Sequence, residues 1–286
     1  MFKRPFFALA AILLSGATAC NSNDKTIVTY STDSTSNPAT MEQPISIKTE
    51  NLDYTGDGVT MKGFAAYNDS LKGPLPVVVI VHEWWGQTDY PRMRAKQLAA
   101  LGYYAFAVDM YGEGKTADSP EDAGKLAKPF YGSMKVSQPR FEAALAMIKK
   151  QARADSSRIL AIGYCFGGAM VLNMARAGEP LKGVVSFHGD LLGNPADKKL
   201  LKADILVCHG EADSFVGPEQ VSGFKKQMDS IGASYTFKSY ADATHAFTNP
   251  GATEKGEKYK LPIKYNPAAD NASWNDMKMF FDKLLK

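Results

Sequence analysis

The chain has 286 residues, of which 45% are hydrophobic and 22% are charged, a composition typical of one globular domain with a sizeable core. Its formal net charge is only +3, and no segment concentrates lysine and arginine into a basic stripe. The charge therefore excludes nucleic-acid binding driven by electrostatic attraction, and no nucleic-acid partner is expected.

The first residues have the features of a secretory signal peptide. A basic start at Lys3 precedes the apolar run Phe6–Leu14, and small residues then lead to Cys20. That run is shorter than the ~20 residues of a permanent membrane helix. The segment resembles a bacterial lipoprotein signal, although alanine stands where that pattern has leucine. We predict a signal peptide over residues 1–20 with lipidation at Cys20, hence an exported protein, periplasmic or outer-membrane-associated, which contacts membrane only through this anchor. The alternative is cleavage near Ala19 and a soluble secreted protein.

Residues 21–44 form a polar segment between this leader and the rest of the chain. They are rich in Ser, Thr, Asn and Asp, so they bury too little apolar surface to offset the entropy of ordering. We predict a flexible linker there and one folded domain over residues 45–286. The domain contains Cys165 and Cys208, each near a predicted strand. If these strands are not neighbours in the sheet, the distance between the two Cα atoms exceeds the ~7 Å limit for a disulfide. We predict two free thiols, in a monomer or small homo-oligomer.

From residue 45 onward, strand-like apolar runs alternate with helix-like segments. A hairpin is predicted over Ile45–Leu52 and Val59–Tyr67, and the run Leu75–Val81 is typical of a buried parallel strand. Further strands are predicted over Tyr103–Val108, Arg158–Gly163, Gly183–Phe187, Asp204–Cys208 and Ser234–Tyr240, and helices over Pro91–Leu101, Pro120–Lys128, Gln138–Arg153, the residues after Gly163, Pro218–Ile231 and Asn271–Leu285. This alternation predicts the α/β class, with a mostly parallel sheet flanked by helices on both faces.

A strand that runs directly into a helix has glycine on either side of a thiol. The motif is Gly163-Tyr-Cys165-Phe-Gly167, which matches the Gly-x-nucleophile-x-Gly pattern of a nucleophile elbow. In such a turn the central residue is strained and exposed, and the free N–H groups of the helix start favour a thiolate and a developing oxyanion. The alternative is a buried structural cysteine in a tight turn.

Chain order supports the elbow, because in the α/β-hydrolase fold an acid and then a histidine follow the nucleophile, each after a strand. Asp213 and His245 occupy these places. His245 would take the thiol proton and later protonate the leaving alkoxide, while Asp213 would orient the ring. Taken singly, Asp213 could cap a helix and His245 could be a surface histidine. The remaining histidines, His82, His188 and His209, lie at strand ends upstream of the expected position.

The strand Leu75–Val81 is followed by His-Glu-Trp-Trp-Gly, in the region that supplies the second oxyanion-hole amide in this fold. The backbone N–H groups of Trp84 and Phe166 are the predicted pair. Glu83 is unusual there, because a carboxylate beside a thiol opposes thiolate formation. Its other interpretation is a salt bridge with a nearby arginine.

Five blocks in order resemble the dienelactone hydrolase family: His82–Gly86, Asp109–Gly112, Gly163–Gly168, His209–Asp213 and Thr244–Phe247. The resemblance covers about residues 46–286. It implies an α/β-hydrolase fold and an ester- or lactone-cleaving enzyme whose nucleophile, acid and base are Cys165, Asp213 and His245. It also implies that Glu83 holds the thiol and helps to deprotonate it. Trp85, Tyr111 and Tyr164, which lie in or beside these blocks, are the candidate pocket residues.

The substrate is less closely indicated, because family members grip a substrate carboxylate with arginines. One of these follows the histidine, where this chain has Thr248-Asn249-Pro250, and no arginine lies between Asp109 and Ser137. A less charged ester or lactone is therefore expected. The polar segment Pro250–Ala269 is either a lid or a solvated surface excursion.

No metal or organic cofactor is expected, since the four histidines lack ligand spacing. Two rival functions remain open. One is a lipid-anchored ligand-binding protein with an inactive hydrolase site. The other is redox sensing or thiol transfer by Cys165, which would need a resolving cysteine close by.

Overall fold

The computed structural model describes residues 45–131 and 134–286. The predicted signal peptide, the lipidation site Cys20 and the linker lie outside the described residues. Among the helices that are described, none is both long and apolar enough to cross a membrane.

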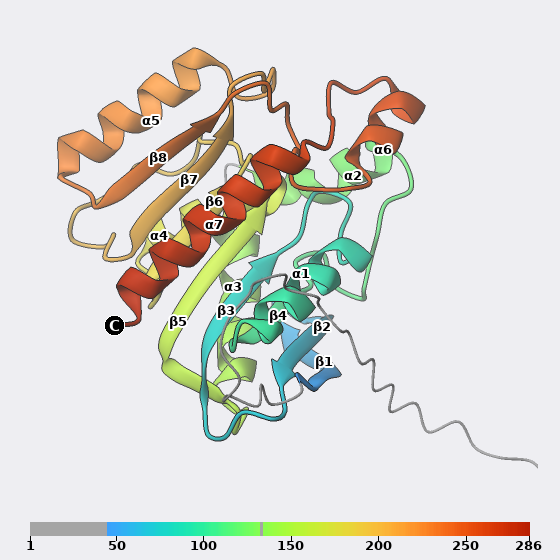
Figure 1. Cartoon of the computed structure of the whole chain (residues 1–286), viewed down its shortest axis with the longest axis vertical. Coiled ribbons are helices and arrows are strands. Elements are labelled where there is room, and N and C mark those ends of the chain that lie inside the picture. Colours follow the sequence, from blue (N-terminus) through green and yellow to red (C-terminus); the bar gives the residue numbers. More distant parts are fainter. Residues whose placement is uncertain (1–44, 132–133) are drawn as a thin grey trace, which may run out of the picture.

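The described residues form one eight-stranded sheet in the order β1-β2-β4-β3-β5-β6-β7-β8 (Figure 1). Pairs β1/β2 and β2/β4 are antiparallel, and all other neighbouring pairs are parallel. The strands are β1 Ile47–Gly56, β2 Val59–Asn68, β3 Leu75–Val81, β4 Tyr104–Val108, β5 Ala154–Tyr164, β6 Gly183–Phe187, β7 Asp204–Gly210 and β8 Tyr235–Tyr240. The predicted fold class, a mostly parallel α/β sheet, is confirmed.

Helices cover both faces of this sheet. They are α1 Asp89–Ala100, α2 Pro120–Ala127, the short 3₁₀ helix η1 Lys128–Phe130, α3 Met134–Ile148, α4 Phe166–Ala177, α5 Pro218–Ile231, α6 Ala252–Tyr259 and α7 Pro267–Leu284. Two apolar cores result: α3, α4 and α5 pack on one face, whereas α1 and α7 pack on the other, which is nearer the viewer in Figure 1. Successive side chains of β3 point to opposite faces of the sheet, so this strand contributes to both cores. Val77 and Val79 belong to the first core, and Val78 and Ile80 belong to the second.

Local sequence explains the main element boundaries. The hairpin of β1 and β2 turns at Asp57 and Gly58, whose φ angles of 54° and 69° suit a two-residue turn between twisted strands. Helix α7 begins at Pro267, earlier than predicted, because the Asn266 side chain accepts a hydrogen bond from the Ala269 amide. Helix α6 was not predicted, since its sequence carries two glutamates and two lysines on a short, weakly patterned segment.

Strand order places the site. The chain leaves β3 toward β4 on one side and resumes at β5 on the other, so the loops after β3 and β5 diverge at the carboxyl edge of the sheet. Open α/β sheets bind ligands at such a point. The two free thiols are confirmed for the described residues: Cys165 follows β5, Cys208 lies on β7, and β6 separates the two strands.

Candidate active site

The turn after β5 holds Cys165 in a strained backbone conformation. Its φ is 53° and its ψ is −114°, a region that residues other than glycine seldom adopt. A Cβ atom on Gly163 would lie 2.0 Å from the Gly167 carbonyl oxygen, and one on Gly167 would lie 2.1 Å from the Val81 carbonyl oxygen. The flanking glycines are therefore required by close backbone approach, as the elbow motif predicts.

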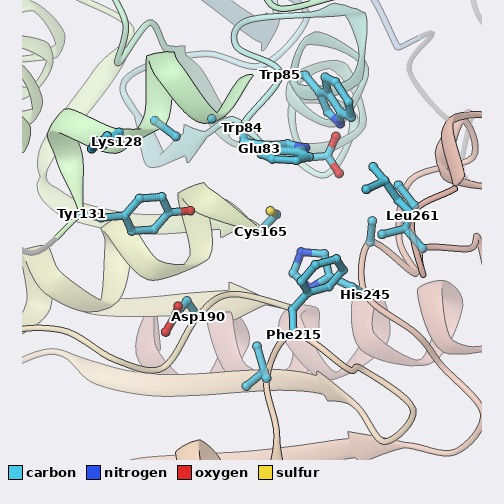
Figure 2. A pocket seen from close by; sticks show the side chains of 15 residues that line it. Glu83, Trp84, Trp85, Lys128, Tyr131, Cys165, Asp190, Phe215, His245 and Leu261 are labelled. Atoms are coloured by element: carbon cyan, nitrogen blue, oxygen red, sulfur yellow. The ribbon is translucent and has the colours of Figure 1, made fainter. Parts of the chain in front are cut away.

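Asp213 and His245 meet beside this turn, although 32 residues separate them in the chain. The His245 Nδ1 atom lies 2.8 Å from the Asp213 Oδ2 atom, and the other Asp213 oxygen accepts a hydrogen bond from the Phe215 amide at 2.9 Å. This arrangement turns Nε2 toward Cys165, next to which the His245 ring lies at the cavity (Figure 2).

The surroundings of His245 favour its charged form. Burial by itself lowers the pKa of the imidazole, but the negative charges of Cys165 and Asp213 and the hydrogen bonds to both raise that pKa to about 10. A protonated histidine beside a cysteine favours the thiolate form that a cysteine nucleophile needs.

The start of α4 and the loop after β3 each present one candidate oxyanion-hole donor. Phe166 is the first residue of α4, so its amide has no partner within the helix. The Trp84 amide makes no hydrogen bond to any other residue within the described ranges. The loop is held by His82, whose Nδ1 lies 2.6 Å from the Glu83 carbonyl oxygen, and by the Tyr111 hydroxyl, which donates to the Trp84 carbonyl oxygen at 3.0 Å.

Glu83 is buried beside the candidate nucleophile, with 3% of its surface exposed. Burial raises the pKa of its carboxyl group, and the nearby Lys255 and a hydrogen bond from Asn249 oppose that rise in pKa. The Asn249 amide donates to Glu83 Oε2 at 2.6 Å. The alternative of a salt bridge with an arginine is therefore wrong, since the direct partner is an amide. Figure 2 shows the carboxylate facing the cavity, across from His245.

These side chains open into a cavity of about 460 Å³. Its walls are largely apolar and aromatic, and Lys128 is the only lysine or arginine among the described residues that line it. The lining residues are Glu83, Trp84, Trp85, Gly124, Ala127, Lys128, Tyr131, Cys165, Asp190, Phe215, Val216, His245, Ala246, Leu261 and Ile263.

Of the three candidate pocket residues, Trp85 lines the cavity and the other two do not. Tyr164 precedes the nucleophile on β5, and because successive strand side chains point to opposite faces, its ring lies in the core under α1 and α7. Tyr111 is 4% exposed and packs against Phe166 with ring centroids 5.4 Å apart, so it lies in the core beneath the cavity wall rather than in the wall itself. The prediction that Tyr111 and Tyr164 line the pocket is therefore wrong.

The segment Pro250–Ala269 forms part of the site. It contains α6, which lies beside α2 in Figure 1, where the Tyr259 hydroxyl donates to the Asp118 carbonyl oxygen. Tyr259 also stacks on Trp85 with ring centroids 6.0 Å apart. Leu261 and Ile263 then reach the cavity wall. The interpretation as a solvated excursion is therefore wrong.

Several lining residues lay outside the sequence prediction. Asp190 follows β6, at the same sheet edge as the loops after β5 and β7, so its position after a strand was an available signal. Tyr131 and Phe215 are 45% and 48% exposed, and in Figure 2 the Tyr131 hydroxyl points toward Cys165. No local pattern distinguishes these two aromatic residues from surface residues.

The other histidines are placed away from the role of base. His82 and His188 are buried and hydrogen-bonded through both ring nitrogens, and burial lowers the pKa of each. His209 lines a second cavity with Asp213 and Lys225. In the described part of the chain no group of three or more His, Cys, Asp or Glu side chains is arranged to hold a metal ion.

Comparisons with known proteins identify the family of this chain. Residues 61–285 match the model of the dienelactone hydrolase family. A protein from Aquifex pyrophilus called protein usf is 30% identical over 82% of this chain and 98% of its own length. A putative carboxymethylenebutenolidase from Aquifex aeolicus is 28% identical over the same shares of the two chains.

Solved structures give the same answer. A dienelactone hydrolase-like promiscuous phosphotriesterase from metagenomic libraries superposes with a TM-score of 0.78 and 32% identity, covering 83% of this chain and 98% of its own. A putative dienelactone hydrolase from Klebsiella pneumoniae, 22% identical with a TM-score of 0.71, shares the fold over 82% of this chain and 98% of its own. The chain therefore belongs to the dienelactone hydrolase family, and it is a carboxylic ester hydrolase of the α/β-hydrolase fold.

Proposed function

We propose that the protein hydrolyses a carboxylic ester or lactone through a Cys-His-Asp triad and a thioester acyl-enzyme. Cys165 is the nucleophile, His245 the base and acid, and Asp213 the group that orients His245. One observation carries the proposal: a cysteine in a strained elbow at the cavity floor lies beside a histidine whose Nδ1 is 2.8 Å from a buried carboxylate.

In the acylation step the Cys165 thiolate attacks the carbonyl carbon, and the carbonyl π electrons move to oxygen. The amides of Phe166 and Trp84 stabilise this oxyanion. Its collapse breaks the C–O bond of the ester, and the His245 imidazolium gives its Nε2 proton to the departing alkoxide. Neutral His245 then takes a proton from water, whose hydroxide attacks the thioester and releases the acid and the thiolate.

Glu83 is proposed as a modulator of the thiol. Its burial raises the pKa of the carboxyl group, so that it holds a proton more readily than an exposed glutamate. The Asn249 hydrogen bond fixes the carboxyl group at the cavity wall. In its ionised form, this carboxylate can receive the thiol proton when a substrate excludes water.

The cavity favours a substrate with little charge. Trp84, Trp85, Phe215 and Leu261 give it apolar walls, and the buried Glu83 carboxyl group disfavours an anionic acyl group. No arginine lines the cavity among the described residues. We propose a neutral, partly apolar ester or lactone that is small enough for about 460 Å³.

The test is hydrolysis of p-nitrophenyl esters of increasing acyl length, small lactones and one neutral phosphotriester, the last because of the solved relative described above. Wild type is compared with Cys165→Ala and Cys165→Ser, and Cys208→Ala is the matched control. Burial raises the pKa of the Cys208 thiol to about 12, so this control removes an inert cysteine.

We expect turnover of at least one ester in wild type and in Cys208→Ala, and a loss of about 10³-fold or more in Cys165→Ala. Inactivity of wild type across the panel, with Cys165 alkylated no faster than a free thiol, would instead support a ligand-binding protein. Fast reversible oxidation of Cys165 that needs Cys208 would support redox sensing.

We also infer, from residues 1–44, that the protein is exported and is anchored by lipid at Cys20. The polar linker would then let the hydrolase domain stand clear of the membrane.

A further inference from the structure

His188 is a buried histidine beside the proposed triad for which the mechanism above has no role. It directly follows β6, has a positive φ of 41°, and is only 1% exposed. Its ring centroid lies 5.3 Å from that of His245, with the rings roughly edge to face. A buried imidazole needs partners for both nitrogens, so those partners define what the residue does.

The two nitrogens have fixed and opposite roles. The Cys165 backbone N–H donates to His188 Nδ1 at 3.1 Å, so Nδ1 must be the unprotonated acceptor. The proton of the neutral ring is then on Nε2, which donates to the Thr248 hydroxyl at 2.7 Å. Burial and the neighbouring charge of His245 lower the pKa of His188, which keeps the ring neutral. His188 thus joins the nucleophile's backbone to Thr248, three residues beyond His245.

Thr248 is itself anchored on the far side. Its hydroxyl lies 2.7 Å from that of Tyr90, and its carbonyl oxygen accepts a hydrogen bond from Arg94 at 2.7 Å. Arg94 in turn forms an ion pair with Asp270 at 2.5 Å. These four residues are each less than one tenth exposed and come from α1, α7 and the loop after β8.

The link acts where the backbone is strained. Cys165 and His188 both have positive φ angles, at 53° and 41°, and neither is glycine. Each such residue costs about 1–3 kcal/mol and persists only when its surroundings over-determine it. The Cys165 amide is held twice, because it also donates to the Phe187 carbonyl oxygen at 3.0 Å. Of its two acceptors, only His188 connects the elbow to the loop that carries His245.

We propose that His188 and Thr248 are positioning residues, whose hydrogen bond holds the Cys165 elbow in register with the His245 loop. This inference rests on the proposed role of Cys165 as nucleophile. His188 acts through the Cys165 amide, and Thr248 acts through His188, so neither exchanges a proton with substrate. A small displacement between reacting groups lowers the reaction rate steeply. The relative position of Cys165 and His245 should therefore affect kcat.

The test compares Thr248→Val with Thr248→Ser in the whole protein. Valine has nearly the shape of threonine but lacks the acceptor for His188, whereas serine keeps the hydroxyl. For both variants and wild type we would measure kcat and KM for a p-nitrophenyl ester, the rate of Cys165 alkylation by iodoacetamide from pH 5 to 10, and Tm. We expect Thr248→Val to lose about tenfold or more in kcat with KM nearly unchanged, and to shift the pH profile of alkylation. Thr248→Ser should stay within about twofold of wild type on both measures.

A purely structural role would change Tm alone. Wild-type kcat and a wild-type alkylation profile in folded Thr248→Val would overturn the proposal. If that variant does not fold, His188→Asn removes the same bond from the other side, because the asparagine oxygen can still accept from the Cys165 amide but cannot reach Thr248. A wild-type alkylation profile in His188→Asn would then overturn it. Alkylation of Cys165 does not depend on ester turnover, so the two proposals fail separately. If the proposed hydrolysis is wrong, wild type is inactive on esters, but the pH profile of its Cys165 alkylation still changes in Thr248→Val.

Discussion

His245 is the residue whose charge state depends most on its neighbours. Desolvation alone disfavours the imidazolium, yet Cys165 and Asp213 raise the pKa to about 10 from the ordinary 6.5. The charged ring is therefore a property of the assembled site rather than of histidine. Because the folded state holds this proton more tightly, the contribution to stability is complete below pH 6.5 and disappears as pH rises to about 10.

The same pKa predicts the alkaline limit of activity. Imidazolium is lost above about pH 10, so kcat/KM for a neutral ester should fall as pH rises through that value. Asp213→Asn removes one negative charge that raises the pKa of His245. We therefore expect the activity of this variant to fall at a lower pH than that of wild type. Glu211→Gln, an exposed carboxyl change two residues away, is the control and should keep the wild-type limit. An unmoved limit in Asp213→Asn would contradict the assignment of that limit to His245.

At the scale of elements, the strand-to-helix turn after β5 is built on close backbone contact. The Cβ that an alanine would add at Gly167 falls 2.1 Å from the Val81 carbonyl oxygen, and backbone atoms cannot retreat as a flexible side chain can. In contrast, Gly223 on the exposed side of α5 has nothing within 4 Å of such a Cβ. Close backbone contact therefore requires glycine at position 167 but not at position 223.

These two positions form a matched pair for thermal unfolding. Gly167→Ala should lower stability by about 3 kcal/mol or more, or roughly 6–12 °C in Tm, and should abolish activity because the elbow shifts. Gly223→Ala should raise stability by about 0.5–1 kcal/mol, since alanine suits a helix interior better than glycine. Equal Tm values for the two variants would show that the elbow tolerates a Cβ.

Helix α6 and the residues after it should set acyl selectivity. Leu261 reaches the cavity wall, so Leu261→Ala is expected to favour longer acyl chains and to raise the ratio of kcat/KM for long over short esters by about tenfold. Leu200→Ala alters a leucine that is 49% exposed and does not line the cavity, and it should leave the ratio unchanged. An unchanged ratio in Leu261→Ala would mean that acyl chains do not contact this wall.

At the scale of the whole molecule, the site is assembled at one edge of the sheet by loops that are distant in the chain. The loops after β3, β5, β7 and β8 bring Glu83, Cys165, Asp213 and His245 together, because parallel strands end at the same edge. The proposed anchor at Cys20 belongs to this scale too, since it would fix where the domain works.

Cys20→Ser tests that anchor. We expect wild type in a bacterial host to incorporate a labelled fatty acid and to sediment with membranes, whereas Cys20→Ser should be unlabelled and soluble after cell lysis. Cys208→Ser, which alters a buried thiol, should label like wild type. Labelling that persists in Cys20→Ser, or is absent from wild type, would contradict the lipoprotein proposal.

The sequence by itself determined the fold class and the family, and it singled out Cys165, Asp213 and His245 as the candidate triad. Strand and helix periodicity, the glycines of the elbow and the order of motifs are local, so they can be read without coordinates. Element boundaries were less secure: α7 starts four residues before its predicted start because a cap at Asn266 outweighs the hydrophobic pattern.

Only the tertiary structure decided the surroundings of those residues. The Glu83 partner Asn249 lies 166 positions along the chain, and the contact between His188 and Thr248 spans 60. Tyr164, although adjacent to Cys165, belongs to the opposite core, because a strand alternates its side chains. Hydrogen-bond partners, cavity walls and pKa values depend on which distant segments pack together, and that packing is set by the sheet order rather than by any local pattern.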